Sequence, residues 1–258
     1  MAIAKTTVLI TGANNGIGLE TVIALAEHSA NFHLFLGSRS LEKGKAALDK
    51  INKGHAGSLK ASISVVQIDV TDPKTIESAK NEVASKFGKL DVLINNAGLL
   101  LVDPAIPAAK KLRDMFETNV VGPNMIIETF EPLLKKSSDP RIINVSSEQG
   151  SITLRLDKTC KYSVVRGDEY RVSKAALNMM SACHRWNFEE WGCKVVAFNP
   201  GFCVTDLTGE AGRKVRIEAG ARSPKDPAYA MLNIVTGKWD DDVAKSGIVD
   251  VDGGVNPW

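Results

Sequence analysis

Short apolar runs alternate with amphipathic stretches along the whole chain, and this alternation limits the folds that the sequence can adopt. The apolar runs have the length of buried strands, and the stretches between them have the periodicity of helices. Such an order predicts a parallel α/β sheet that is covered by helices on both faces. We expect strands at 7–10, 32–36, 63–68, 92–94, 142–145, 195–198 and 247–251, and helices at 18–29, 41–53, 73–87, 112–135 and 170–191.

Composition excludes several classes of function. The chain has 258 residues, of which 44% are hydrophobic and 24% charged, and its net charge is +2. This small charge, without a basic cluster, argues against a nucleic-acid or membrane partner. The four cysteines form no C-x-x-C pair and the four histidines have no H-x-x-x-H spacing, so we expect no metal site. Without a signal peptide or a membrane-spanning apolar run, we expect a cytoplasmic protein with reduced thiols.

Three glycines follow the first expected strand, at the point where the chain turns into the first expected helix. They are Gly12, Gly16 and Gly18. Glycine permits a tight turn and close approach to a ligand, and a helix N-terminus presents unpaired N–H groups. The arrangement favours a pyrophosphate-binding loop. A glycine-rich turn without a ligand is the alternative, and the position directly after the first strand argues against it.

Tyr170 and Lys174 are four residues apart in an expected helix, so both side chains lie on one face. A free tyrosine has a pKa near ~10 and forms a phenolate poorly at neutral pH. A neighbouring ammonium group stabilises the phenolate and lowers that pKa. The pair is therefore suited to acid–base chemistry at a carbonyl or an alcohol. An amphipathic surface helix could carry the same pair, so the choice depends on the other motifs.

Further motifs follow these two in a consistent order along nearly the whole chain. They are Asp69-Val70, Asn95-Asn96-Ala97-Gly98, Asn119, Ser146-Ser147, Pro200-Gly201 and Thr205. Together with Gly-x-x-x-Gly-x-Gly and Tyr-x-x-x-Lys, this set resembles the short-chain dehydrogenase/reductase family. The resemblance implies a nicotinamide cofactor and hydride transfer between a carbonyl and an alcohol.

The resemblance also implies a single Rossmann-fold domain over residues 1–258. We expect a doubly wound, mostly parallel sheet of seven strands with helices on both faces. Residues 1–145 would mainly bind the cofactor, and residues 146–258 would carry the catalytic and substrate-binding groups. Compared with the family, the chain has an insertion near 151–168, and residues 205–224 would form a mobile lid.

The family pattern assigns catalytic roles to matching positions. Tyr170 is the acid and base, and Lys174 tunes it and holds the nicotinamide ribose. A serine after the fifth strand binds the substrate oxygen, and both Ser146 and Ser147 stand there. We favour Ser147, because Gly150 follows it at the family's spacing and strand alternation turns Ser146 the other way.

Asn119 matches the family's helix asparagine, whose backbone carbonyl holds a water linked to the catalytic lysine. An α-helical carbonyl accepts from the N–H four residues later, and that residue is Pro123. Proline has no N–H, so the Asn119 carbonyl is left without its usual donor. A simple helix kink is compatible with this role.

The end of the second expected strand indicates which cofactor binds. An acidic residue there would select NAD, whereas this strand ends Ser38-Arg39. A guanidinium pairs well with a 2′-phosphate, so we expect NADPH/NADP+ and regard NAD(H) as the alternative. Many NADPH-dependent relatives carry a second basic residue in the glycine loop, where this chain has Asn14-Asn15. The cofactor contacts that the resemblance implies are Gly12, Asn14, Asn15, Gly16, Ile17, Gly18, Ser38, Arg39, Asp69, Val70, Asn95, Ala97, Gly98, Tyr170, Lys174, Pro200, Gly201, Cys203 and Thr205.

These features predict an NADPH-dependent reductase of ketones or aldehydes on small organic molecules, with Tyr170 as the proton donor. The insertion, Arg39 and Trp258 resemble the carbonyl-reductase branch of the family. One alternative is an NAD(P)+-dependent alcohol dehydrogenase running in reverse. Another is a cofactor-binding protein without redox turnover, although such proteins usually lack the tyrosine or the lysine. Many relatives pair through the helices that hold Asn119 and Tyr170, which favours a homodimer or homotetramer.

Overall fold

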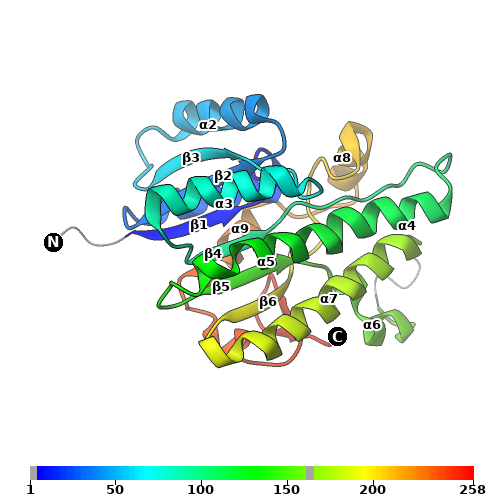
Figure 1. Cartoon of the computed structure of the whole chain (residues 1–258). Helices are drawn as coiled ribbons and strands as arrows, with labels where there is room; N and C mark the ends of the chain where they lie inside the picture. The colour runs from blue at the N-terminus through cyan, green and yellow to red at the C-terminus, as the bar shows by residue number, and fades with distance from the viewer. Residues whose placement is uncertain (1–4, 161–165) are drawn as a thin grey trace.

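In the computed structural model, which describes residues 5–160 and 166–258, all eight strands join one sheet in the order β3-β2-β1-β4-β5-β6-β7-β8 (Figure 1). The strands from β1 to β7 run parallel, and β8 pairs antiparallel with β7. The chain leads outward from β1 to β3 and returns to β4, so the strand order reverses between β1 and β4. Ligands of such sheets bind beyond the carboxyl ends of the strands at this reversal. The strands are β1 Thr6–Ile10, β2 Phe32–Ser38, β3 Ser62–Gln67, β4 Val92–Asn95, β5 Arg141–Val145, β6 Lys194–Asn199, β7 Ile248–Asp250 and β8 Val255–Asn256.

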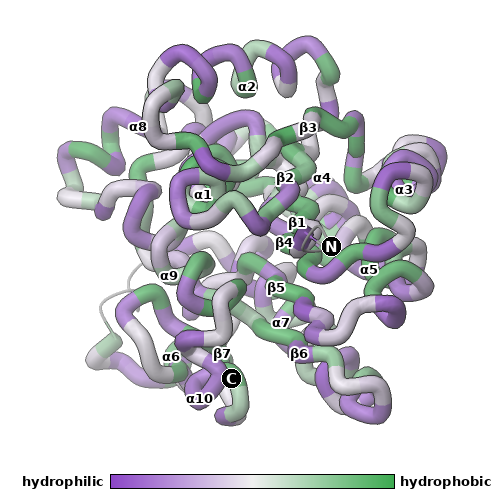
Figure 2. Tube along the Cα trace, turned by 90° about the vertical axis from the view of Figure 1, so that its left-hand side faces the viewer, coloured by the Kyte–Doolittle hydropathy of each residue, from purple (hydrophilic) through white to green (hydrophobic). Residues whose placement is uncertain are grey.

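Helices cover both faces of this sheet (Figure 2). Each parallel connection needs a crossover, and a crossover helix packs back on the sheet. No helix in the described part of the chain is both long and apolar enough to cross a membrane. The helices are α1 Gly16–His28, α2 Leu41–His55, α3 Pro73–Phe87, α4 Ala108–Phe116, α5 Gly122–Leu134, α6 Ile152–Leu156, α7 Asp168–Phe188, α8 Gly209–Glu218, α9 Lys225–Val235 and α10 Asp240–Val243, with a π-helical turn Glu117–Val121 and 3₁₀ turns Glu148–Gly150 and Glu189–Trp191.

The apolar core has two layers, one on each side of the sheet. Successive side chains of a strand point to opposite faces, and β1 follows this rule. Val8 and Ile10 pack in a cluster with α1, α2 and α9, whereas Leu9 packs in a second cluster with α3 and α5. Figure 2 shows α1 and α9 on one side of the sheet and α3 and α5 on the other. The strands are thus held rigidly, and their carboxyl ends keep a fixed arrangement.

The expected sheet of seven strands is extended by an eighth, β8. Gly253 and Gly254 both have positive φ, at 86° and 75°, and turn the chain back on β7. β8 has two residues and pairs Val255 with Val249. A strand this short carries no apolar alternation, so the sequence pattern could not reveal it.

The helix expected at 112–135 is longer and is divided in the middle. It begins at Ala108, and the π-helical turn Glu117–Val121 separates α4 from α5. The Gly122 N–H donates to the carbonyl of Glu117, five residues back. Pro123 lies at the start of α5, so the ladder changes register next to the residue that lacks an N–H. This turn carries Asn119.

Candidate active site

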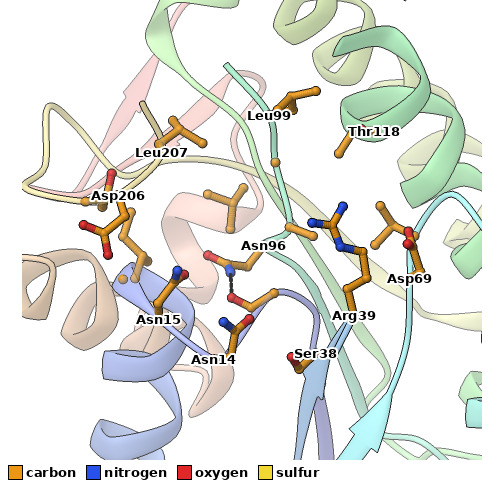
Figure 3. Close-up of a pocket in the computed structure, with 18 of the residues that line it drawn as sticks. Asn14, Asn15, Ser38, Arg39, Asp69, Asn96, Leu99, Thr118, Asp206 and Leu207 are labelled. Atoms are coloured by element: carbon orange, nitrogen blue, oxygen red, sulfur yellow. Dashed lines mark hydrogen bonds between the residues drawn. The ribbon is translucent and has the colours of Figure 1, made fainter. Parts of the chain in front are cut away.

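A cleft of about 540 Å³ opens at the carboxyl edge of the sheet, between the β1–α1 loop, the ends of β2, β3 and β4, and helix α7. Figure 3 shows that side chains from segments far apart in the sequence converge on it. The size is in the range of small-molecule and cofactor sites. The predicted residues that line the cleft are Gly12, Asn14, Asn15, Gly16, Ile17, Ser38, Arg39, Asp69, Val70, Ala97, Gly98, Tyr170, Lys174, Pro200 and Thr205.

The glycine loop forms one wall of the cleft. A Cβ on Gly12 would lie 2.9 Å from the Cα of Ala97, so the two loops meet backbone to backbone. Gly16 has φ +56°, which other residues rarely adopt. Asn15 precedes α1 without capping it through its side chain, so the first N–H groups of the helix lack a side-chain acceptor. Unpaired N–H groups at the start of a 13-residue helix suit the binding of a phosphate.

Gly18 has a packing role behind this wall. A Cβ there would lie 2.5 Å from Nδ2 of Asn96 and 2.9 Å from the carbonyl oxygen of Gly12. The Asn96 amide donates to that same carbonyl at 3.1 Å (Figure 3). Asn96, which was not assigned a cofactor contact from the sequence, lines the cleft, whereas Asn95 donates to Oδ1 of Asn144 on β5. Strand alternation turns these two neighbours in opposite directions.

A basic end of the cleft follows β2. The exposed Arg39 side chain extends into the cleft on the same side as Asp69 (Figure 3). Lys43, in the first turn of α2, also lines this end. The Ser40 hydroxyl caps the helix by accepting a hydrogen bond from the backbone N–H of Lys43. Sequence reasoning missed Lys43, because the search for a second cation was limited to the glycine loop. The spacing of Arg39 and Lys43 around the start of a helix was the available signal.

Tyr170 and Lys174 lie one turn apart in α7, as expected for residues at i and i+4. The Lys174 Nζ is 5.7 Å from the centroid of the Tyr170 ring and donates to the carbonyl of Val145 at 2.8 Å. Lys174 is buried, and burial lowers the pKa of its ammonium to about 8. Gly150 allows this packing, because a Cβ there would lie 2.6 Å from the backbone carbon of Lys174.

The Tyr170 phenol differs from the sequence expectation of a lowered pKa. Burial raises the pKa of Tyr170 to about 12, against smaller lowering effects from the charge of Arg216 and a hydrogen bond with Ser147. In the protein without cofactor, desolvation outweighs the stabilisation of the phenolate. Tyr170 is therefore a protonated donor throughout the physiological range of pH.

The two neighbouring serines have different surroundings. The Ser147 hydroxyl accepts from the N–H of Gln149 at 3.1 Å and is close enough to the Tyr170 phenol to lower its pKa. The Ser146 hydroxyl donates to Oδ1 of Asn178 within α7 and is buried. Ser146 lines the cleft, but of the two serines Ser147 is the one that lowers the pKa of Tyr170.

Asn119 connects the loop after β4 to helix α7 through hydrogen bonds of its side chain. Its buried side chain accepts from the N–H of Leu99 at 2.7 Å and donates to the Leu99 carbonyl at 2.9 Å. It also donates to the hydroxyl of Ser173 at 3.1 Å, which ties the π-helical turn to α7. Leu99 lines the cleft, so Asn119 holds the β4 loop against the helix of Tyr170.

Gly201 and Cys203 lie in the loop after β6. Gly201 has φ +70° and makes the turn that follows Pro200. The buried Cys203 thiol donates to the carbonyl of Pro200 at 3.1 Å, and burial raises its pKa to about 12. A thiol with such a pKa is a packing group, because the reactive form is the thiolate.

Comparison with known proteins agrees with this geometry. The sequence model of one family, described as short chain dehydrogenase, matches residues 6–216. The chain belongs to this family. Short-chain dehydrogenase anuI from Penicillium roqueforti is 38% identical over 226 residues, which cover 86% of this chain and 87% of the relative. Short-chain dehydrogenase/reductase tropE from Talaromyces stipitatus is 33% identical over 269 residues and 98% of each chain.

The solved structure of a carbonyl reductase is similar over the whole fold. NADPH-bound carbonyl reductase from chicken fatty liver has a TM-score of 0.78 and 27% identity, with 99% of this chain and 100% of that chain covered. The present chain is therefore an oxidoreductase of the family, which uses NAD(P) and acts on alcohol and carbonyl groups. Within the described residues, no three His, Cys, Asp or Glu side chains are grouped to hold a metal ion.

Proposed function

We propose that this short-chain dehydrogenase uses NADPH to reduce a ketone or aldehyde of a small organic molecule. The observation that carries the proposal is the neutral phenol of Tyr170 at the cleft, near Ser147 and beside the buried Lys174. The phenol is protonated at neutral pH and can donate to a carbonyl oxygen, as reduction requires.

The roles of the residues follow from their contacts. When bound, the nicotinamide cofactor supplies the hydride to the carbonyl carbon. Ser147 orients the substrate by donating a hydrogen bond to the carbonyl oxygen, and Tyr170 donates its proton to that oxygen. Lys174 lies 5.7 Å from the ring and offsets the negative charge that develops on the phenol oxygen. Asn119 keeps the loop of Leu99 in place beside them.

The test of this function is direct. Purified protein with NADPH is incubated with a panel of aromatic and aliphatic aldehydes and ketones, and alcohols are detected by mass spectrometry. We expect NADPH-dependent conversion of at least one carbonyl class. If no carbonyl compound is converted and alcohols are oxidised readily by NADP+ at pH 7, the protein catalyses the reverse reaction.

All four cysteines are free thiols, which supports a cytosolic location for the protein.

We expect NADPH to bind more tightly than NADH, because Arg39 and Lys43 line the end of the cleft where β2 stops without a carboxylate. Arg39→Ala should weaken NADPH roughly tenfold, since a hydrogen bond to a charged group contributes ~1.5–3 kcal/mol and this side chain is exposed to screening. Lys43→Ala should weaken NADPH less, and neither change should affect NADH. The measurement is a fluorescence titration of both cofactors into each variant.

Lys45→Ala is the matched control, because Lys45 is an exposed lysine of α2 outside the cleft lining. It should leave both affinities unchanged. Equal affinities of the wild-type protein for NADPH and NADH would contradict the preference.

We also propose that the protein forms a homodimer or homotetramer through α7. Val172, Met179 and Trp186 are seven residues apart and 49%, 66% and 80% exposed, so they form an apolar stripe on the surface. A contiguous apolar surface of this kind marks an interface. Light scattering should give a multiple of the monomer mass, and Trp186→Glu should reduce it. A monomeric wild-type protein at micromolar concentration would refute the assembly.

A further inference from the structure

The lid segment, residues 205–224, places a helix at the carboxyl edge of the sheet. In Figure 1, α8 lies on the side of the sheet where the strands end, and α4 and α6 extend on the same side. Asp206 and Leu207, at the start of the lid segment, line the cleft. Helix α8 follows these two residues directly, so it begins next to the cleft.

Arg216 is the α8 side chain that is fixed toward the catalytic groups. Its Nη1 donates to the carbonyl of Cys203 at 3.2 Å, and its guanidinium lies 5.2 Å from the centroid of the Phe202 ring. Its charge is close enough to Tyr170 to lower the pKa of the phenol. Arg216 is a half-buried residue, and one backbone acceptor and one aromatic ring hold its guanidinium.

Arg216 is the lid cation without a carboxylate partner in the described part of the chain. The remaining stretches, 1–4 and 161–165, contain no Asp or Glu. A half-buried charge is costly unless a partner compensates it, and most guanidinium donors of Arg216 have no protein acceptor among the described residues. The other lid cations have carboxylate partners: Arg213 with Asp206, Lys214 with Glu210, and Arg222 with Asp252.

We propose that Arg216 binds an anionic oxygen of the substrate, a carboxylate or an ionised phenol, while the substrate carbonyl reaches Tyr170 and Ser147. This inference rests on the proposed reductase function and specifies its substrate class as acidic carbonyl compounds. A guanidinium presents paired donors that match a carboxylate, which gives both affinity and orientation. Arg216 selects the substrate, whereas Tyr170 carries out the proton transfer.

The position of Arg216 also links binding to the chemistry. An empty Arg216 lowers the pKa of Tyr170, which favours loss of the phenol proton. An anion on the guanidinium offsets this field, so Arg216 acts on both the bound anion and the Tyr170 phenol.

The test measures binding, so it does not depend on turnover. The three positional isomers of acetylbenzoate and their methyl esters are titrated into protein saturated with NADP+, where no hydride is available for reduction. In the wild type, at least one acid should bind about tenfold or more tightly than its ester, which is the effect of a charged hydrogen bond. Arg216→Gln should remove that difference and leave the ester affinity unchanged.

Lys214→Gln is the matched control, because it removes the same charge from an exposed position of α8 and leaves no cleft carboxylate unpaired. It should preserve the preference for the acid. The affinity for NADP+ is measured in each variant. If Arg216→Gln weakens NADP+ and leaves the acid preference intact, Arg216 holds a cofactor phosphate and the inference is wrong.

The inference also fails if no acid binds better than its ester in the wild type, including the case in which neither binds. Failure of the proposed function gives a different result. In that case, the acid preference depends on Arg216, but NADPH does not reduce these ketones.

Discussion

Tyr170→Phe should abolish NADPH-dependent reduction and leave NADPH affinity largely unchanged. The ring and its packing in α7 remain, and only the hydroxyl that donates the proton is lost. General acid catalysis contributes ~10²–10⁴-fold, so we expect the rate to fall by about three orders of magnitude. The measurement is a single-turnover rate at saturating NADPH and pH 7, with the cofactor affinity determined by titration.

The two adjacent serines provide an internal control for this prediction. Ser147→Ala removes the hydroxyl that lowers the pKa of Tyr170 and that we assign to the substrate oxygen, so it should slow turnover strongly. Ser146→Ala removes a buried hydrogen bond to Asn178, so its main effect should be on stability. Near-normal turnover by Tyr170→Phe would overturn the mechanism, and the reverse ranking of the serines would overturn the choice of Ser147 alone.

Most of the fold follows from patterns that depend on local physical rules. Buried parallel strands require apolar runs, and the helices between them require amphipathic stretches, so seven strands could be located from the sequence. Helix α3 illustrates this, because Asp72 caps its start, Pro73 occupies its first turn and Gly88 ends it with φ +69°. The short β8 follows two turn glycines and had no such pattern.

The site was less predictable where it depends on the direction of side chains and on desolvation. The approach of Lys43 to the cleft depends on how α2 packs on β2, so its spacing from Arg39 was a signal that could be used only with the start of that helix in place. The pKa of Tyr170 depends on its burial, and burial opposes the effect that an adjacent lysine suggests. The π-helical turn at Asn119 was signalled by Pro123 but could not be placed without the packing of α4 and α5.

Lys174→Met should reduce both turnover and NADPH affinity. The variant keeps a side chain of similar length but loses the ammonium that supports the Tyr170 phenol and that we assign to the nicotinamide ribose. We expect a rate loss of about 10² or more at pH 7, as for loss of a group that supports general acid catalysis. Rates and cofactor affinities are measured as for Tyr170→Phe. The Tyr170 and Lys174 variants should thus differ in NADPH affinity. If Lys174→Met retains the NADPH affinity of the wild type, Lys174 does not contact the nicotinamide ribose.

The same substitution should change how stability depends on pH in the protein without cofactor. Burial lowers the pKa of Lys174 to about 8 from its ordinary 10.5, so between these values the unfolded chain binds a proton that the folded chain does not. The contribution of Lys174 to the free energy of unfolding therefore increases by about 3 kcal/mol as the pH rises from 8 to 10.5. Below pH 8 this contribution does not change with pH. Other groups titrate in this range, so the measured quantity is the difference between wild type and Lys174→Met in urea unfolding. A difference that does not change with pH would mean that Lys174 remains charged in the folded protein, held by the Val145 carbonyl and by water.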